Sequence, residues 1–350
     1  MAATLLGISD SRKGENDSVK RRYRTGDQNW VRERNLAILL DYLWQAGGTI
    51  SRARLTEISG LNKSTVGSLL ADLQSWGLVK ETGTAAQGPG RPGVLIDLNP
   101  DTGRVIGAEI GVDFAAAVVA DLRGQVVWQR HVELPSEGAG TARKPASVLK
   151  RAERLVQEAV NQASTCRCRL YGIGLGVPGL VDRATGTLLF APNLGWQDVQ
   201  LGERWRERFS VPVVVENEAN AAALGERMLG VARQVDNFVY LSAGIGLGGG
   251  VVIDGKLYSG VGGFAGEVGH MTLEPDGPPC NCGNRGCWET LVAPQAIVRR
   301  VREAARAQGT AGAAEVTSMD EVLDAAARGR QCAGVEFRLR ARQDILACKA

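Results

Sequence analysis

Residues 280–289 read Cys280-Asn281-Cys282-Gly283-Asn284-Arg285-Gly286-Cys287-Trp288-Glu289, and His270 lies ten positions before Cys280, in Gly266-Glu267-Val268-Gly269-His270. Three cysteines and one histidine make a tetrahedral zinc set, and the turn residues let a short loop bend its thiolates toward one point. The alternative is a chance cluster of free or buried thiols. We favour zinc, because the cluster is dense and His270 is one of only 2 histidines. The carboxylates Glu267 and Glu289 beside it indicate a binding site built against the metal.

The composition limits the classes of protein to consider. A length of 350 residues allows two or three domains with sizeable cores. The net charge of +3 is too small to argue for nucleic acid by itself. No apolar run approaches a membrane span, and the N-terminus is polar rather than a signal peptide. Zinc-type spacing with four leftover thiols fits a reducing cytosol better than a disulfide scaffold; these thiols are Cys166, Cys168, Cys332 and Cys348.

The first 99 residues predict a basic arm followed by a small α+β domain. Residues 1–29 are polar and contain Lys20-Arg21-Arg22-Tyr23-Arg24, which predicts a flexible arm that is either a solvated tail or a DNA contact. Residues 30–99 carry three amphipathic helical patterns and then a predicted hairpin, formed by residues 78–81 and 94–98 around a glycine-rich turn. This order is typical of a winged helix-turn-helix.

The predicted recognition helix has a polar start. In a helix-turn-helix, the second helix enters the major groove with its first residues near the base edges. These residues here are short polar groups and one cation, suited to bases and phosphates: Asn62, Lys63, Ser64, Thr65 and Ser68. Arg52 and Arg54 lie where the preceding helix would cross the DNA backbone, and Arg91 lies on a narrow tip that could enter a minor groove. Operator DNA is the predicted partner; a helical domain for protein contacts is the alternative.

After Asn99-Pro100 the pattern changes to alternating strands and helices. Strands are predicted at residues 105–110, 115–121, 126–132, 170–177, 211–215, 238–242 and 250–253, and helices at 146–163 and from about 218 to 229. This alternation predicts an α/β domain over residues 100–350, in which helices cover a sheet.

The cysteine loop and the Glu267–His270 segment resemble the ROK family of repressors, open reading frames and sugar kinases. Four further segments match the family in its order, at residues 174–182, 192–196, 215–222 and 244–250. The resemblance runs from about residue 100 to 300, and a winged helix-turn-helix ahead of such a domain is the layout of the repressor branch. It implies a ribonuclease-H-like, actin/hexokinase-type fold, a sugar pocket between two lobes, and often dimers or tetramers.

The resemblance also implies site residues. The metal ligands would be His270, Cys280, Cys282 and Cys287, and four protein ligands leave no open position, so the zinc would be structural. The sugar contacts would be Asn217, Glu218, Glu267, His270 and Glu289, with Gly179 and Asn193 nearby. Such a pocket rejects analogues that lack the matching hydroxyls, because its own polar groups would be left unpaired. The zinc would hold Glu267 and Glu289 in place.

Two departures from the family's kinases favour a sensor over an enzyme. The kinases begin this domain with Asp-x-Gly-Gly-Thr, whereas this chain has Glu109-Ile110-Gly111-Val112-Asp113. Val112 prevents the close backbone approach that glycine allows, and Asp113 puts a negative charge where phosphate oxygens would lie. The kinase base position holds Glu218 instead of aspartate, and a misplacement of about 1 Å can cost on the order of a hundredfold in rate. The glycine-rich turn at 244–250 is retained; we favour a tight turn over a phosphate loop.

The chain beyond residue 300 departs from the family as well. An amphipathic segment at 319–327 precedes a tail to Ala350 that lacks a Gly-Gly nucleotide motif and has little hydrophobic periodicity. This pattern predicts an incomplete second lobe with exposed apolar surface, from either a frameshifted reading or a lineage-specific truncation.

The sequence therefore predicts a cytoplasmic, sugar-responsive regulator of carbohydrate metabolism genes. We favour a repressor that binds an operator as a homodimer or homotetramer and responds to a sugar or sugar phosphate. The alternative is an ATP-dependent, glucokinase-like sugar kinase with an appended DNA-binding domain. A third possibility is a zinc-stabilised interaction protein that binds neither sugar nor specific DNA.

Overall fold

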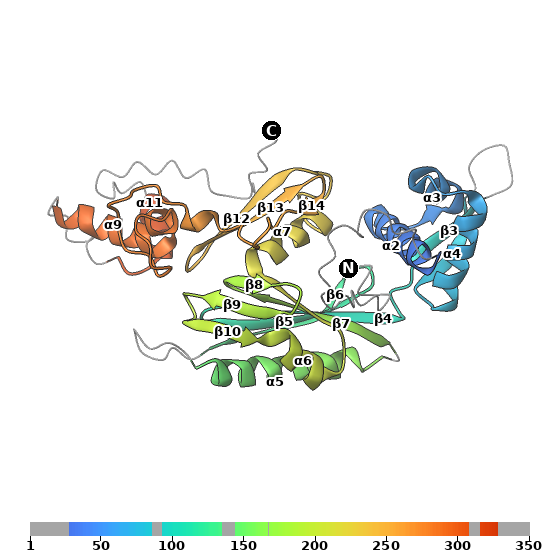
Figure 1. The fold of residues 1–350 in the computed structure, drawn as a ribbon, viewed down its shortest axis with the longest axis horizontal. Helices are drawn as coiled ribbons and strands as arrows, with labels where there is room; N and C mark the ends of the chain where they lie inside the picture. The colour runs from blue at the N-terminus through green and yellow to red at the C-terminus, as the bar shows by residue number, and fades with distance from the viewer. Residues whose placement is uncertain (1–27, 86–92, 135–143, 167, 308–315, 328–350) are drawn as a thin grey trace, which may run out of the picture.

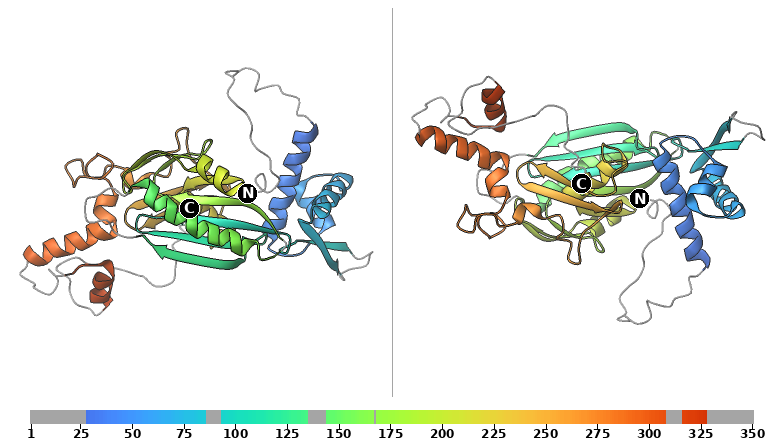
Figure 2. Two further views of the ribbon diagram at one scale, coloured as in Figure 1. Left: turned by 90° about the horizontal axis from the view of Figure 1, so that it is seen from below. Right: turned by 90° about the horizontal axis from the view of Figure 1, so that it is seen from above.

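The computed structural model describes residues 28–85, 93–134, 144–166, 168–307 and 316–327, which form three regions along the longest axis (Figure 1). A helical region with its own small sheet lies at one end. Two larger sheets with their helices lie in the middle, and helices α9 (Pro294–Ala307) and α11 (Met319–Ala327) lie at the other end. Figure 2 shows the same order from two further sides. In the described part of the chain, no helix is long and apolar enough to cross a membrane.

The N-terminal region combines three helices with a three-stranded antiparallel sheet. Its elements are α2 (Gln28–Ala46), β1 (Ile50–Ser51), α3 (Arg52–Ser59), α4 (Lys63–Ser75), β2 (Val79–Ala85) and β3 (Gly93–Leu98). Ser51 and Asn62 cap α3 and α4 through their side-chain oxygens, and Gly60 ends α3 in the left-handed conformation. Leucines from all three helices share one buried core. The predicted three helices and hairpin are confirmed, and the hairpin tip at residues 86–92 lies outside the described residues.

A five-stranded mixed sheet forms the core of the first lobe (residues 103–217). Its strands are β4 (Gly103–Ile110), β5 (Phe114–Asp121), β6 (Val126–Glu133), β7 (Arg169–Val177) and β11 (Val213–Asn217), in the order β11-β7-β4-β5-β6. The first three strands form an antiparallel meander, whereas β7 and β11 add in parallel. Helices α5 (Pro145–Ala163) and α6 (Leu201–Phe209) lie along one side of the sheet and bury their apolar residues with it (Figure 1).

A smaller sheet and one helix form the core of the second lobe (residues 218–327). Helix α7 (Glu218–Met228) follows β11 directly and packs on β12 (Phe238–Ala243), β13 (Leu247–Ile253) and β14 (Lys256–Leu257). The packing is close, because a side chain at Gly250 would lie 2.6 Å from the Cβ of Ala223. The 3-10 turn η2 (Val268–His270), the cysteine loop and α8 (Glu289–Val292) lead on to α9. Figure 1 shows α7 and this sheet facing the sheet of the first lobe.

Two features of the sequence interpretation need correction or addition. Five short strands were not predicted: β1, β14, β8 (Leu180–Asp182), β9 (Thr187–Ala191) and β10 (Trp196–Gln200), of which the last three form a small antiparallel sheet. Helices α6, α8 and α9 were not predicted either. The prediction that Cys166 and Cys168 are unpaired is wrong, because the structure joins them in a disulfide. The turn after α5 brings their Cα atoms to 5.1 Å, a separation that a disulfide can span. Cys332 and Cys348 lie outside the described residues.

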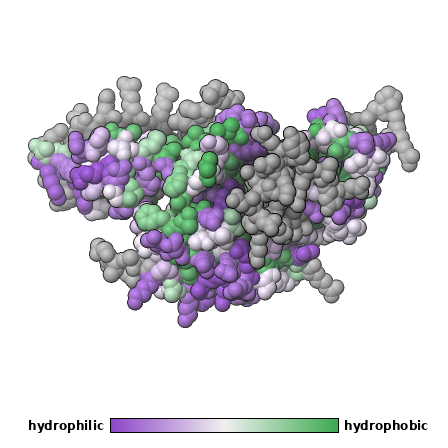
Figure 3. Space-filling model, viewed as in Figure 1, coloured by the Kyte–Doolittle hydropathy of each residue, from purple (hydrophilic) through white to green (hydrophobic). Residues whose placement is uncertain are grey.

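The second lobe exposes apolar side chains on its sheet. Strand β12 lies at a sheet edge, and its alternate residues Val239 and Leu241 are 56% and 47% exposed. Figure 3 shows apolar residues in green over this part of the molecule. The exposed apolar surface predicted for this lobe is therefore present among the described residues, while the tail at 328–350 lies outside them.

Candidate functional site

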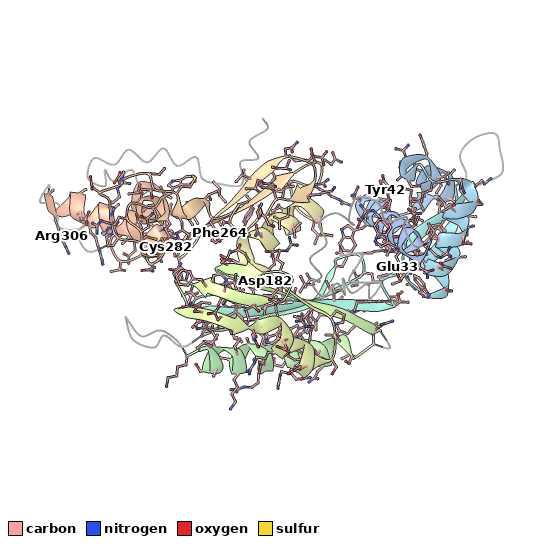
Figure 4. The ribbon with its side chains drawn as sticks, in the orientation of Figure 1. Glu33, Tyr42, Asp182, Phe264, Cys282 and Arg306 are labelled. Carbon is pink, nitrogen blue, oxygen red and sulfur yellow. A yellow bond between two sulfur atoms is a disulfide. The ribbon has the colours of Figure 1, made fainter. Side chains whose placement is uncertain are left out.

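A cavity of about 620 Å³ lies between the two lobes. It is lined by every residue that the resemblance named as a sugar contact: Gly179, Asn193, Asn217, Glu218, Glu267, His270 and Glu289. The segment from Glu109 to Asp113 and the glycine-rich turn at 244–249 contribute to the same lining. Phe264 and Cys282, which also line the cavity, are labelled in Figure 4 between the second-lobe sheet and helices α9 and α11. The fold thus gathers segments that are far apart in the sequence.

The predicted metal ligands form a compact cluster beside this cavity. The ligand atoms of His270, Cys280, Cys282 and Cys287 all lie within 4.8 Å of one another. The sulfurs of Cys282 and Cys287 are 3.7 Å apart, and Cys280 Sγ lies 3.7 Å from His270 Nδ1. Metal–sulfur bonds of about 2.3 Å in tetrahedral geometry place two sulfurs about 3.8 Å apart. The four side chains are therefore already spaced to hold one metal ion.

The chemistry of the thiols is consistent with this spacing. Burial raises the pKa of the Cys280 and Cys287 thiols, and Cys280 Sγ donates to Glu289 Oε1 at 2.8 Å. A bound cation would displace the thiol protons, because metals bind the thiolate form. Cys280 and Glu289 are neighbours, and Glu289 lines the cavity, so the cysteine cluster directly adjoins the cavity.

His270 and Glu289 link the cysteine cluster to other groups that line the cavity. His270 turns Nδ1 toward the cysteines, and its Nε2 lies 3.7 Å from Glu267 Oε2. Glu289 Oε2 accepts a long hydrogen bond of 3.4 Å from the backbone N–H of Leu247, at the start of β13. One cluster therefore positions two predicted sugar contacts and touches the glycine-rich turn.

The start of α7 brings two more predicted contacts to the cavity. Asn217 caps the helix, since its Oδ1 accepts from the N–H groups of Ala219 and Asn220, and its Nδ2 donates to the carbonyl of Gly179 at 3.1 Å. Gly179 has a φ of +109°, and a Cβ there would lie 2.3 Å from the Phe190 carbonyl oxygen, so glycine is required. Glu218 follows as the first helical residue, and its Oε2 is buried with no hydrogen-bond partner among the described residues.

Three carboxylates of the cavity are less acidic than usual. Burial, as the largest cause, together with the charges of Glu267 and Glu109 raises the pKa of Glu218 to about 7. Burial also raises the pKa of Glu267 and of Glu109, an effect that His270 and His131 respectively oppose. A neutral ligand rich in hydroxyls suits such a group, because hydroxyls can donate to a carboxylate and accept from a carboxylic acid.

The two lobes also meet through their loops. Asn193, in the turn between β9 and β10, accepts a hydrogen bond of 2.9 Å from Asn281 in the cysteine loop. Asn281 was visible in the quoted motif but had no predicted role, since its partner lies 88 residues away. The cavity residues Phe190 and Phe264 were also missed, because no local pattern marks them.

The end of the cavity predicted to face phosphate has a different character. Val112 packs against the first-lobe core, and Asp113 is exposed at the cavity. In the glycine-rich turn, a side chain at Gly248 would lie 3.0 Å from Ala219 Cβ, and one at Gly246 would lie 2.8 Å from Glu289 Oε2. Internal packing is therefore sufficient to explain these glycines.

Some of the side chains predicted to contact DNA are exposed, and some of them already form hydrogen bonds within the protein. Lys63 and Ser64 are exposed at the start of α4 and Thr65 is half-buried, whereas the Asn62 side chain is occupied in capping Thr65 N–H and accepting from Ser64 Oγ. Arg32, which was not predicted, donates to Ser68 Oγ at 3.1 Å and pairs with Asp72.

Of the three arginines predicted to contact DNA, two form ion pairs within the protein, and the third is not among the described residues. Arg52 donates to Glu81 on β2 at 2.7 Å, and Arg54 lies 2.8 Å from Glu57. Arg54 is exposed and Arg52 is partly exposed, so DNA phosphates could compete with these surface pairs, which contribute little stability. Arg91 lies outside the described residues.

Known proteins resemble this chain in sequence and in structure. The Xylose repressor of Bacillus spizizenii is 38% identical over 276 residues, which cover 79% of this chain and 70% of that protein. A crystal structure of a ROK family transcriptional regulator, described as a homologue of the E. coli MLC protein, has a TM-score of 0.65 and 30% identity, covering 80% of this chain and 70% of that chain.

A ROK family glucokinase from Streptomyces griseus, solved with glucose and AMPPNP, has a TM-score of 0.56 and 33% identity, covering 66% of this chain and 73% of that chain. These likenesses confirm the predicted mixed α/β fold of the hexokinase type. The ROK family profile matches residues 105–345, beyond the point near residue 300 where the motifs end. The chain belongs to the ROK family.

Proposed function

We propose that the protein is a sugar-responsive DNA-binding repressor of carbohydrate metabolism genes. One observation carries the proposal: all the predicted sugar contacts line one cavity, in a chain that also holds an N-terminal region of three helices and a hairpin. The likeness to a Xylose repressor over 79% of the chain supports the same conclusion. D-Xylose is accordingly the first effector to test, with D-glucose as the second.

The chemistry of the cavity supports a sugar ligand. The unpartnered Oε2 of Glu218 offers an acceptor to a hydroxyl, and Glu267 and Glu289 flank His270 nearby. Neighbouring hydroxyls on a sugar ring can satisfy several of these groups together. A sugar that lacks one hydroxyl would leave a buried polar group unpaired, which costs about 1–3 kcal/mol.

The metal proposed for the cysteine cluster is Zn²⁺ in a structural role. Three thiolates and one imidazole are a characteristic zinc set, and four protein ligands leave no position for a reacting water. His270 would bind it through Nδ1, and its Nε2 would remain directed at Glu267. The zinc would therefore stabilise the sugar-contacting carboxylates and take no part in chemistry.

Operator DNA is the proposed macromolecular partner. The start of α4 presents Lys63 and Ser64 to solvent, and the partly exposed Arg52 and the exposed Arg54 lie on the preceding helix. We place α4 in the major groove and propose a dimer or tetramer on a palindromic site, because two-fold symmetric proteins match two-fold symmetric operators. A cytoplasmic location follows from this role.

A sugar kinase is the second candidate, supported by the likeness to a glucokinase and by Glu218 beside the cavity. We consider it the weaker candidate, because Asp113 brings a negative charge to the end where a triphosphate would lie. An ATP-consumption assay with D-glucose and D-xylose separates the two, and turnover above background would favour the kinase.

The regulator is tested by measuring sugar and DNA binding together. A DNA site would be selected from a random library with zinc-loaded protein, and its affinity measured with and without D-xylose or D-glucose. We expect one sugar to weaken DNA binding, and the same DNA to weaken binding of that sugar by an equal factor. Tight sugar binding of identical affinity in free and DNA-bound protein would contradict the proposal.

A further inference from the structure

The N-terminal region is attached firmly to the first lobe. Leu122 and Tyr171 of the first lobe belong to the same buried core as the leucines of α2, α3 and α4. Arg123 bonds the buried Asp97 at 2.5 Å, and Thr102 donates to the carbonyl of Gly77 at 2.9 Å. Shared apolar burial of this kind resists separation, so these two parts would move together.

The second lobe contacts the same region at the end of α2. Arg233 Nη2 donates to the carbonyl oxygens of Gln45 at 2.8 Å and of Trp44 at 3.4 Å. The last carbonyls of a helix have no partners inside the helix and carry a negative partial charge, so an arginine is favourable there. Gly124 of the first lobe lies close to both Trp44 and Leu229, so α2, the end of α7 and the first lobe meet at one point.

Side chains of α7 fix the segment that carries Arg233. Arg227 donates to the backbone carbonyl of Arg233 at 2.6 Å and to Asp236 at 2.9 Å. Glu226 accepts from the backbone N–H of Val231 at 3.0 Å. The turn after α7 is therefore held by its own helix, and Arg233 should follow any displacement of α7.

The opposite end of α7 is the cavity. The helix begins at Glu218, directly after its cap Asn217, and both residues line the cavity. At 1.5 Å per residue its 11 residues span about 16 Å. A short α-helix moves as a rigid unit, so a displacement of Glu218 would also displace Arg233, whose segment is bonded to α7.

Helix α2 continues the connection to α4. Near its N-terminus Arg32 donates to Ser68 and Asp72, and near its C-terminus Trp44 and Gln45 accept from Arg233. A continuous series of contacts thus runs from the cavity through α7, Arg233 and α2 to α4, the helix proposed to enter DNA.

We propose that Arg233 is a positioning residue that transmits occupancy of the cavity to the DNA-binding region. The proposal rests on the proposed function and names its regulatory contact. A sugar bonded to Asn217 and Glu218 displaces α7 relative to the first lobe, which pulls Arg233 away from the two carbonyls. Because the first lobe holds the N-terminal region, α2 does not follow Arg233, and its C-terminal end loses this donor. The released end of α2 adjusts within the N-terminal region, and Arg32 at its other end transmits the adjustment to α4.

The experiment compares zinc-loaded full-length wild type with Arg233→Ala, Arg233→Lys and the neighbouring exposed control Gln234→Ala. D-Xylose and D-glucose are the probes. Three quantities are measured: sugar affinity, the sugar-dependent change in affinity for the selected DNA, and the sugar-dependent change in amide hydrogen exchange over residues 43–48. Arg233 is exposed, so the variants should fold, which a thermal melt checks.

In wild type we expect a sugar-dependent factor in DNA affinity within the common allosteric range of about 5- to 150-fold. Arg233→Ala should bring this factor close to 1 and abolish the exchange response, while sugar affinity stays equal or becomes tighter. Arg233→Lys should restore part of the response, because an ammonium group can also bond the carbonyls, and Gln234→Ala should match wild type.

The outcomes separate this inference from the proposed function. A wild type that binds neither sugar would overturn the proposed function, and the inference with it. A full response retained in Arg233→Ala would overturn the inference alone. Loss of sugar affinity together with the response, without rescue by lysine, would show a folding role for Arg233 and would also overturn it.

Discussion

The two ends of the cavity differ in how their polar groups are held. At the end formed by Glu267, His270 and Glu289, each group contacts another, and the cysteines of the predicted metal site adjoin them. At the end formed by residues 109–113, the charged Asp113 is exposed, and Val112 packs toward the core. A preorganised end suits selective binding of a neutral ligand, whereas an exposed carboxylate opposes phosphate. The difference supports our proposal that the cavity binds a sugar as an effector and not as a kinase substrate.

The largest expected effect comes from removing a metal ligand, which tests whether the first end depends on the cluster. Cys287 is fully buried and does not itself line the cavity, so an effect of Cys287→Ser on sugar binding must pass through the cluster. We expect loss of most bound zinc, measured by mass spectrometry, and a fall in sugar affinity above about 100-fold, because two hydrogen-bonding carboxylates lose their support.

The matched control is Cys332→Ser, a thiol outside the motif, which should retain zinc and sugar affinity. Binding of the selected DNA in the absence of sugar should survive in both variants, because the core that the N-terminal region shares with Leu122 and Tyr171 contains no residue of the cysteine loop. Unchanged sugar affinity in zinc-free Cys287→Ser would show that the cluster does not support the pocket.

The next effect compares the two ends directly. Glu267→Gln keeps the size of the side chain but replaces one acceptor oxygen with a donor, so a sugar hydroxyl that donates there loses its partner. We expect the dissociation constant for the sugar to rise about 5- to 150-fold, measured by calorimetry. Asp113→Asn, the equivalent change at the other end, should leave sugar affinity unchanged. Equal losses of sugar affinity in both variants would show that the two ends of the cavity do not differ in how they bind the sugar.

The sequence predicted those parts of the site in which chemistry and spacing are local. The cysteine loop could be predicted because its three cysteines lie within eight residues of one another, and β5 could be predicted because Ala115 to Ala120 form a short apolar run. In the structure the residues of β5 alternate between half-buried and buried. Helix α9 could have been predicted from Ile297, Val298 and Val301, which repeat at helical spacing.

Other parts depend on contacts that no local pattern records. Arg233 meets α2 across 188 residues, and Asn193 meets the cysteine loop across 88. Arg52 was predicted to contact DNA from its position alone, yet its partner in the structure is Glu81 on a strand that the hairpin brings beside it. Strand β8 has only 3 residues, too few to show a periodicity. The folded chain brings the partners of Arg233, Asn193 and Arg52 beside them, and a local sequence pattern does not contain this information.

The smallest expected effect concerns Glu218, whose pKa is raised mainly by burial and in addition by the charges of Glu267 and Glu109, one from each end of the cavity. The pKa of about 7 lies above the ordinary value of 4.5, so between these values the folded protein binds more protons than the unfolded chain. Stability therefore falls as the pH rises through 7, and it is regained on acidification. Glu218→Gln removes the titrating group, so the melting temperature of zinc-saturated protein should fall less between pH 6 and pH 8.5 than in wild type. Asp113→Asn, an exposed carboxylate, should leave the wild-type slope unchanged. If Glu218→Gln kept that slope, Glu218 would not titrate with a raised pKa, and neither its burial nor the charges of its neighbours would shape the pH dependence of stability.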